Sequence, residues 1–224
     1  MKTVVYLATK NLYRQAAACI NSCLQNGNID EVFILTEGGF PYYSFRVHEI
    51  DVSGQTFFPK DSMNVNTRWT WMCLMKTAMT EIFPDKERIL ILDCDTIVEH
   101  DISSLWNLDI DYYAMARQYD DGRQGRFTQN YYFNAGVLMC NLKKLRDGTE
   151  KRIRKVLNEK KYDYPEQDAI NEICKDHITV LPSRYNTCQF THLDDVIYIR
   201  HFAAFGDWVK GYWFEKYEVK NGES

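Results

Sequence analysis

Two aspartates, Asp93 and Asp95, directly follow the apolar run Ile89–Leu92. A short run this rich in β-branched residues is typical of a strand that is buried on both faces. Side chains alternate along an extended chain, so a turn at the strand end is needed to bring both carboxylates together. Two such oxygen ligands with open positions around them suit Mg²⁺ or Mn²⁺ bound together with a substrate phosphate. The tripeptide alone also fits an acidic turn that caps the next element.

The elements before this pair alternate between strand and helix patterns. The sequence predicts strands at residues 4–7, 32–35, 46–52 and 89–92, and helices at residues 11–25 and 66–83. The first helix pattern ends at Asn26-Gly27 and the second stops at Pro84. This alternation predicts an α/β fold with a mostly parallel sheet flanked by helices. Ligands of such sheets bind beyond the carboxyl ends of the strands, where Asp93 and Asp95 fall.

The second half of the chain is more varied. It predicts strands at residues 112–117, 136–142, 178–181 and 196–199, and helices at residues 143–160 and 166–174. The polar stretch 118–130 is predicted to be a mobile surface loop. His201 follows the last strand pattern, so it too is expected at the carboxyl edge of the sheet. We interpret the aromatic tail 202–217 as a C-terminal helix packed on the core, with a sugar-stacking platform as the alternative.

Composition narrows the class of protein. The 224 residues suit a single α/β domain, and the formal charge of −4 argues against non-specific nucleic-acid binding. Basic clusters at 143–144 and 151–155 fit a solvated helix face. Seven scattered cysteines without a CxxC pair indicate reduced thiols. With no signal peptide or apolar span of ~20 residues, a cytoplasmic location is expected.

Four further segments follow the aspartate pair in order: Tyr132–Leu142 (YFNAGVLMCNL), Pro165–Asn171 (PEQDAIN), Leu181–Asn186 (LPSRYN) and Ile199–Phe202 (IRHF). Together with DCD, this set resembles glycosyltransferase family 8 over about residues 4–201. The resemblance implies one GT-A (Rossmann-like) domain over residues 1–224. Residues 1–100 would form its nucleotide-binding half and residues 101–224 its donor-sugar and acceptor half.

The resemblance also implies an activity. Family 8 enzymes move a hexose, such as glucose or galactose, from a UDP-sugar to an acceptor and retain the anomeric configuration. The acceptor would be a glycan, a lipid-linked sugar or a protein. The resemblance makes Asp93, Asp95 and His201 the metal ligands, and the imidazole favours Mn²⁺ over Mg²⁺. The metal would stabilise the departing diphosphate without any proton transfer.

Further site residues follow from the same resemblance. Lys76 would face the donor phosphates, with a solvated helix face as the alternative. Gln167 would lie beneath the anomeric carbon and stabilise positive charge on the sugar in a front-face substitution. A covalent intermediate on Glu166 or Asp168 is the alternative route. The donor-binding set is completed by Ala8, Thr9, Tyr13, Cys94, Asn134, Ala135, Gly136 and Lys210.

Two departures from the family pattern stand out. Lys10 takes the place of the aspartate that normally contacts the uracil base, so the sequence leaves the identity of the bound nucleotide open. The family's late Lys-Pro-Trp lysine is missing, although Trp208 is kept, and Lys210 is the nearest substitute. Two alternatives therefore stay open: a non-catalytic sugar-nucleotide or glycan-binding domain, and a phosphatase of the haloacid dehalogenase type. The phosphatase motif usually opens its chain, whereas Asp93 lies far from the start.

Overall fold

The computed structural model describes residues 1–118, 132–191, 195–203 and 206–219. Its centre is a seven-stranded sheet in the order β3-β2-β1-β4-β7-β6-β8. The strands are β1 (Thr3–Leu7), β2 (Glu31–Thr36), β3 (Val47–Asp51), β4 (Arg88–Leu92), β6 (Tyr113–Gln118), β7 (Tyr132–Asn141) and β8 (Ile178–Leu181). A small second sheet pairs β5 (Thr96–Val98) with β9 (Ile199–His201) in antiparallel fashion.

The central sheet is mostly parallel. Strands β3, β2, β1 and β4 run in the same direction, and β8 runs parallel to β6. Only β7 runs antiparallel to both of its neighbours, β4 and β6. The predicted α/β fold with a mostly parallel sheet flanked by helices is confirmed.

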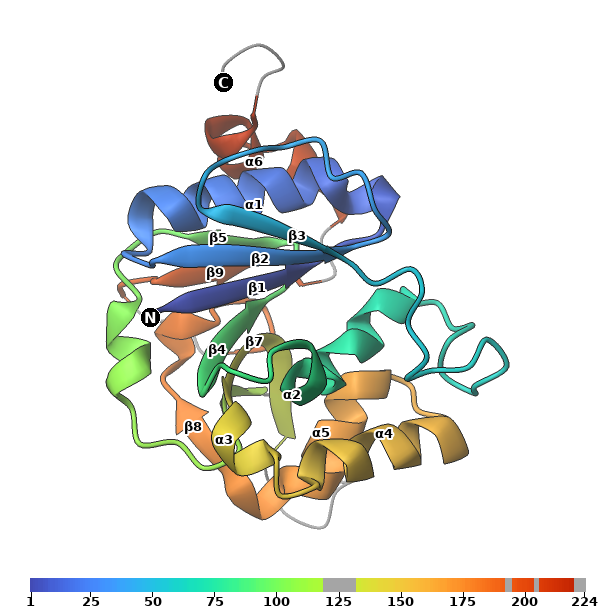
Figure 1. Ribbon diagram of the computed structural model, residues 1–224. Coiled ribbons are helices and arrows are strands. Elements are labelled where there is room, and N and C mark those ends of the chain that lie inside the picture. Colours follow the sequence, from blue (N-terminus) through green and yellow to red (C-terminus); the bar gives the residue numbers. More distant parts are fainter. Residues whose placement is uncertain (119–131, 192–194, 204–205, 220–224) are drawn as a thin grey trace.

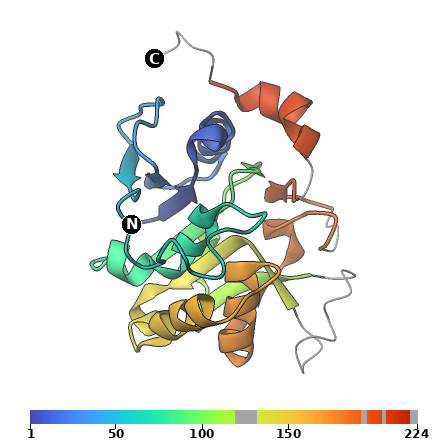
Figure 2. The same cartoon turned by 90° about the vertical axis from the view of Figure 1, so that its right-hand side faces the viewer.

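Helices cover both faces of this sheet. They are α1 (Tyr13–Asn26), α2 (Met79–Ile82), α3 (Leu142–Leu145), α4 (Thr149–Glu159), α5 (Pro165–Cys174) and α6 (Tyr212–Tyr217). Short 3-10 helices span Lys10–Leu12, Trp71–Thr77, Ser103–Asn107, Lys175–His177, Ser183–Tyr185 and Gly206–Lys210. Figures 1 and 2 both show α1 and α6 on one side of the molecule and α4 and α5 on the other.

Two apolar cores lie on the two faces of the sheet. Val4 and Tyr6 of β1 pack into the core on the α1 side, while Val5 and Leu7 pack into the opposite core. Strands buried on both faces have no polar face, which explains their continuous apolar runs. Phe214 of α6 belongs to the core on the α1 side, so core packing by the C-terminal segment is confirmed.

Two predicted helices are wrong in extent. The pattern at 66–83 forms only the 3-10 helix Trp71–Thr77 and the short α2, because the Glu150 carboxylate accepts the backbone N–H groups of Met79 and Thr80 and starts a new helix there. The pattern at 143–160 is divided into α3 and α4 by Gly148, whose φ of +104° ends any regular helix.

The end of the chain also differs from the prediction. The sequence predicts a strand at 196–199, but the observed strand is β9, Ile199–His201. Its bounds differ because it pairs with the short strand β5, residue for residue, and does not join the central sheet. Apart from Gln118, which ends β6, the predicted loop 118–130 lies outside the described residues.

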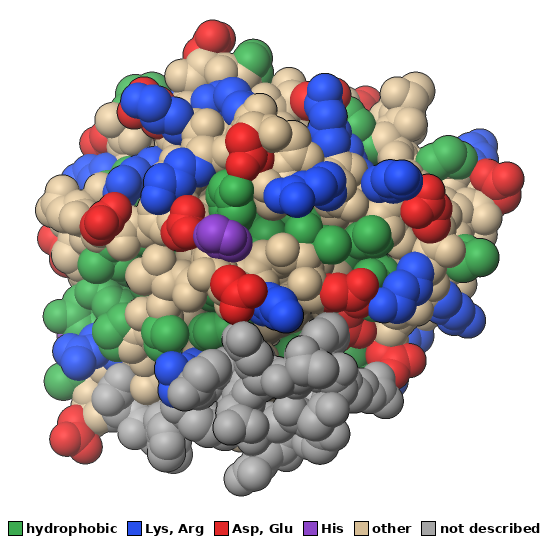
Figure 3. Space-filling view, turned by 90° about the horizontal axis from the view of Figure 1, so that it is seen from below, with side chains coloured by type: hydrophobic (Ala, Val, Ile, Leu, Met, Phe, Trp, Pro, Cys, Tyr) green, Lys and Arg blue, Asp and Glu red, His purple; other side chains and the backbone are tan. Residues whose placement is uncertain are grey.

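The surface carries charges of both signs. The face seen from below in Figure 3 shows Lys and Arg side chains interspersed with Asp and Glu. Lys143 pairs with Glu87 and Lys144 pairs with Asp111, as expected for a solvated helix face. All seven cysteines have free thiols. None of the helices in the described ranges has the length and apolar character of a membrane span.

Candidate active site

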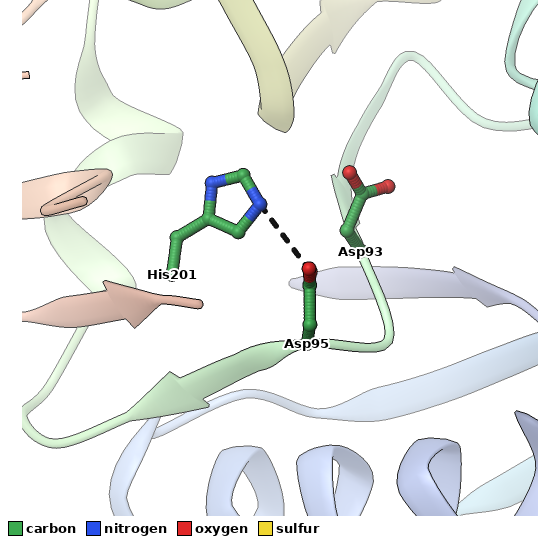
Figure 4. Close-up of side chains that lie close together, drawn as sticks. All are labelled: Asp93, Asp95 and His201. Atoms are coloured by element: carbon green, nitrogen blue, oxygen red, sulfur yellow. Dashed lines mark ion pairs between the residues drawn. The ribbon is translucent and has the colours of Figure 1, made fainter. Parts of the chain in front are cut away.

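The turn after β4 gathers the two aspartates. The Asp93 N–H donates to the Gly136 carbonyl (2.9 Å), which continues the pairing of β4 with β7 by one residue. The Thr96 hydroxyl donates back to the Asp93 carbonyl (2.7 Å) and closes the turn. Figure 4 shows that both carboxylates consequently extend to the same side of this turn.

His201 reaches the pair from the small second sheet. It lies opposite Thr96 in the β5–β9 register, and its Nε2 is 3.3 Å from Asp95 Oδ1 (Figure 4). One ligand atom from each of Asp93, Asp95 and His201 lies within 4.8 Å of the others. Asp95 Oδ1 is buried and accepts no hydrogen bond from the described residues. A buried carboxylate oxygen without a donor, facing an imidazole nitrogen, fits a bound cation.

Lys76 is the buried cation beside this cluster. Its side chain is 3% exposed, and its Nζ lies 2.7 Å from Asp93 Oδ1 and 3.2 Å from Glu166 Oε1. The same Nζ donates to the Ala135 carbonyl (3.1 Å). The alternative of a solvated helix face for Lys76 is therefore wrong.

The charges of these groups are mutually dependent. Burial raises the pKa of the Asp93 carboxyl above its usual value, and the Lys76 ammonium opposes this rise. Burial acts on Asp95 as well, but the positive charge of His201 outweighs it, and the pKa of Asp95 is lowered. For His201, burial favours the neutral form, but Asp95 raises its pKa to about 10. Burial opposes ionisation of Glu166, yet Lys76 keeps its pKa below the usual value.

A cavity of about 500 Å³ opens over this cluster. Its polar lining includes Lys76, Asp93, Cys94, Asp95, Gln118, Asn134, Glu166, Gln167 and His201. Gly136 also lines it, and a methyl group on Gly136 would lie 2.1 Å from His201 Cε1. Gly136 is therefore required by the position of the His201 ring, and its predicted contact with the donor sugar stays a prediction. The volume lies in the range usual for small-molecule sites.

Hydrogen-bonded amides form the wall of the cavity around Gln167. The Ala135 N–H donates to Gln167 Oε1 (2.9 Å), so Gln167 Nε2 is the donor to the Tyr132 hydroxyl (2.8 Å). Asn134 Nδ2 donates to Gln118 Oε1 (3.2 Å). These contacts fix both amides in place before any ligand binds.

Asp168 lies behind this wall. Its Oδ1 accepts from the Tyr132 hydroxyl (2.5 Å), and its Oδ2 accepts from the Tyr164 N–H (2.9 Å). It is not among the residues that line the described cavity, whereas Glu166 and Gln167 are.

The predicted base-binding residues lie at the β1–α1 junction and are not themselves among the residues that line the cavity. Ala8 is fully buried, the Thr9 hydroxyl donates to Asn11 Oδ1 (2.7 Å), and the Tyr13 hydroxyl donates to the Gly38 carbonyl (3.1 Å). The neighbouring Leu7, Leu12 and Gln15 line the cavity instead. The roles predicted for Ala8, Thr9 and Tyr13 stay predictions.

Of the two remaining predicted donor-binding residues, Cys94 lines the cavity and Lys210 does not. The Cys94 thiol donates to the Leu7 carbonyl (3.1 Å). Lys210 is largely exposed and pairs with Asp207 (3.1 Å), while the adjacent Trp208 and Val209 line the cavity. The predicted phosphate contact of Lys210 also stays a prediction.

The sequence did not single out several lining residues. Cys73, Trp69, Tyr164 and Gln118 reach the cavity from separate segments.

Asn186 was recognised only as part of the LPSRYN segment, yet its Oδ1 lies 2.8 Å from His201 Nδ1. Only the match of that segment to a family motif drew attention to Asn186, and it gave no role.

Comparison with known proteins agrees with this geometry. The family model described as glycosyl transferase family 8 matches residues 3–199. The chain therefore belongs to glycosyltransferase family 8, and the resemblance inferred from its motifs is confirmed. Membership of this family also sets aside the phosphatase alternative.

The individual relatives have only modest sequence identity to this chain. A Haemophilus influenzae protein, provisionally named a glycosyltransferase, is 30% identical over 162 residues, 64% of this chain and 47% of the relative. The lipopolysaccharide 1,2-glucosyltransferase of Escherichia coli is 31% identical over 113 residues, 45% of this chain and 33% of that enzyme. The matched stretches thus span half or less of these relatives.

A solved structure shows the shared fold. The galactosyltransferase LgtC, in complex with donor and acceptor sugar analogues, superposes with a TM-score of 0.70 at 18% identity. The alignment covers 98% of both chains. The GT-A fold expected from the sequence is confirmed.

Proposed function

We propose that this chain is a retaining glycosyltransferase that moves a hexose, glucose or galactose, from a UDP-sugar to a glycan or another acceptor. A divalent metal, Mn²⁺ or Mg²⁺, would be held by Asp93, Asp95 and His201. The observation that carries the proposal is the convergence of these three side chains with the buried Lys76 at the floor of one cavity. Family membership and the glucosyltransferase and galactosyltransferase relatives support the same activity.

The charged groups suit the leaving group of this reaction. A nucleoside diphosphate departs with several negative charges, and a bound divalent metal would stabilise them as a Lewis acid. Lys76 adds a positive charge that is fixed in position by Asp93 and Glu166, so it needs no rearrangement during the reaction. Without a metal, two phosphates beside two carboxylates would repel each other.

Gln167 suits stabilisation of the sugar. Its Oε1 already accepts one N–H, and a carbonyl oxygen keeps a second lone pair that can face positive charge on the anomeric carbon. The involvement of Asp168 with Tyr132 and Tyr164, and of Glu166 with Lys76, supports front-face substitution over a covalent intermediate. Both carboxylates would have to leave these partners before either could attack.

A non-catalytic sugar-nucleotide or glycan-binding domain is the second candidate. Lys210 and the predicted base contacts Ala8, Thr9 and Tyr13 favour it, because none of these four residues is among those that line the cavity.

One experiment separates the two candidates. The protein is incubated with UDP-glucose or UDP-galactose and Mn²⁺, with and without sugar acceptors, and release of UDP is measured together with NMR of the first product. The proposal expects metal-dependent release of UDP and a product that keeps the anomeric configuration of the donor. Tight binding without any release would support the binding domain, and an inverted product would overturn the mechanism.

A further inference from the structure

The orientation of His201 is determined by a chain of buried amides. Asn134 Oδ1 accepts the Gly136 backbone N–H (2.9 Å), and a backbone N–H can only donate. This contact fixes which end of the Asn134 amide is the oxygen. The nitrogen of Asn186 must then face it, and Asn186 Nδ2 donates to Asn134 Oδ1 at 2.9 Å.

The next link is the imidazole. With its nitrogen turned to Asn134, Asn186 presents Oδ1 to His201 Nδ1 at 2.8 Å. An amide oxygen can only accept, so Nδ1 must carry the proton of the ring. In the neutral imidazole the other nitrogen, Nε2, is then left with a lone pair. That nitrogen faces Asp95 Oδ1 at 3.3 Å, in the cluster with Asp93.

We propose that Asn186 is a positioning residue that fixes His201 as the Nδ1–H tautomer and presents its Nε2 lone pair to the metal shared with Asp93 and Asp95. This inference rests on the proposed function, because it concerns the imidazole assigned to the metal. Hydrogen bonds from the far nitrogen of a ligating histidine orient the ring in many metal sites.

The surroundings of Asn186 support this role. The residue is fully buried, and its backbone is held by the Ser183 carbonyl (2.8 Å) and the Thr191 hydroxyl (2.6 Å). The next residue, Thr187, hydrogen-bonds along β9 through the Ile199 carbonyl and the His201 N–H. Asn186 therefore lies beside His201 through backbone pairing and not through its side chain alone.

The first test reads the tautomer without metal or donor. In the Asp95→Ala variant, loss of the carboxylate lets His201 become neutral at mildly alkaline pH, and the ¹⁵N shifts of the ring show which nitrogen carries the proton. We expect Nδ1–H in Asp95→Ala and a shift toward Nε2–H when Asn186→Leu is added. Nε2–H in the single variant, or an unchanged tautomer in the double variant, would overturn the inference.

The second test reads Mn²⁺ affinity by calorimetry in the otherwise unaltered protein. We expect Asn186→Leu to weaken binding ~10- to 100-fold, the usual loss for a group that orients a ligand. Asn64→Leu is the matched control, because Asn64 is equally buried and its amide bonds Leu157, Lys160 and Tyr162, all outside the cavity lining. Equal losses in both variants would mean a purely structural role and would contradict the inference.

A third variant guards against misfolding. Asn186→Asp keeps an oxygen that can accept the Nδ1 proton but loses the donor to Asn134 Oδ1, so its Mn²⁺ affinity should lie between those of the unaltered protein and His201→Ala, even if Asn186→Leu does not fold. An affinity as low as that of a protein without His201, measured on His201→Ala, would count against the proposal. The tautomer test involves no turnover, so failure of sugar transfer leaves it intact, and an Nε2–H tautomer would overturn this inference alone.

Discussion

The two polar walls of the cavity differ in whether their buried groups already have hydrogen-bond partners within the protein. The charged wall consists of Lys76, Asp93, Asp95 and His201, and the amide wall consists of Gln118, Asn134 and Gln167, with Asn186 hydrogen-bonded to Asn134 behind it. On the charged wall, Asp95 Oδ1 has no hydrogen-bond donor among the described residues. On the amide wall, backbone N–H groups of Ala135 and Gly136 fix the orientation of Gln167 and Asn134.

This difference separates what the protein provides from what a ligand must add. The amide wall is neutral and already hydrogen-bonded, so it gives a fixed geometry at little cost when the ligand binds. On the charged wall, His201 must lose its proton to bind a metal, which leaves two carboxylates against the one ammonium of Lys76, so this wall gains most from an added cation. We therefore expect substitutions on the charged wall to act on binding, and substitutions on the amide wall to act on rate or geometry.

The largest effect is expected at Asp95. Asp95→Asn removes a charged metal ligand while keeping the size of the side chain, so Mn²⁺-dependent binding of UDP-sugar should fall below detection in calorimetry. Asp111→Asn is the control, since that carboxylate pairs with His177 and Lys144 away from the cavity. If donor affinity is unchanged in Asp95→Asn, the charged wall is not required for donor binding.

A smaller effect, confined to rate, is expected at Gln167. Gln167→Ala should lower kcat and kcat/KM together by ~10- to 1000-fold, because a contact made only in the transition state is lost. Donor affinity should hardly change. Gln25→Ala, on the exposed part of α1, provides the control. A variant that loses donor affinity and keeps kcat would place Gln167 among the binding residues instead.

Gly136 connects the two walls, and its substitution should affect stability. In Gly136→Ala the added methyl group would meet the His201 ring at 2.1 Å from Cε1, so unfolding should require ~1–3 kcal/mol less free energy. Weaker Mn²⁺ binding should accompany the loss, because His201 must move. In Gly54→Ala the methyl group has no neighbour within 4 Å, and chemical denaturation should show little change. Equal stability of the two variants would mean that Gly136 does not lie as close to the His201 ring as the structure shows.

The smallest effect is expected at Lys210. Its ion pair with Asp207 is exposed and screened by solvent, so Lys210→Ala should change UDP affinity by less than ~5-fold if the side chain stays where it lies. A much larger loss in calorimetry would mean that Lys210 moves to the phosphates when the donor binds. That result would extend the charged wall to the C-terminal segment.

The sequence predicted the charged wall better than the amide wall. Asp93 and Asp95 follow a short apolar strand, and the position of such a strand can be read from the sequence alone. The link between Asn186 and His201 depends on the pairing of β9 with β5 and with the adjacent Thr187, which leaves no local pattern. The helix predicted at 66–83 failed for a similar reason, since Glu150 is distant in sequence from the N–H groups that it accepts.

The central claim is that a divalent cation on the charged wall is required for the donor to bind. Calorimetric titration of UDP-glucose and UDP-galactose into the protein, in Mn²⁺ and then in EDTA, tests it most directly. We predict that at least one of the two donors binds in Mn²⁺ and that binding is lost in EDTA, because the diphosphate and the carboxylates then repel each other. Equal affinity under both conditions would contradict the account.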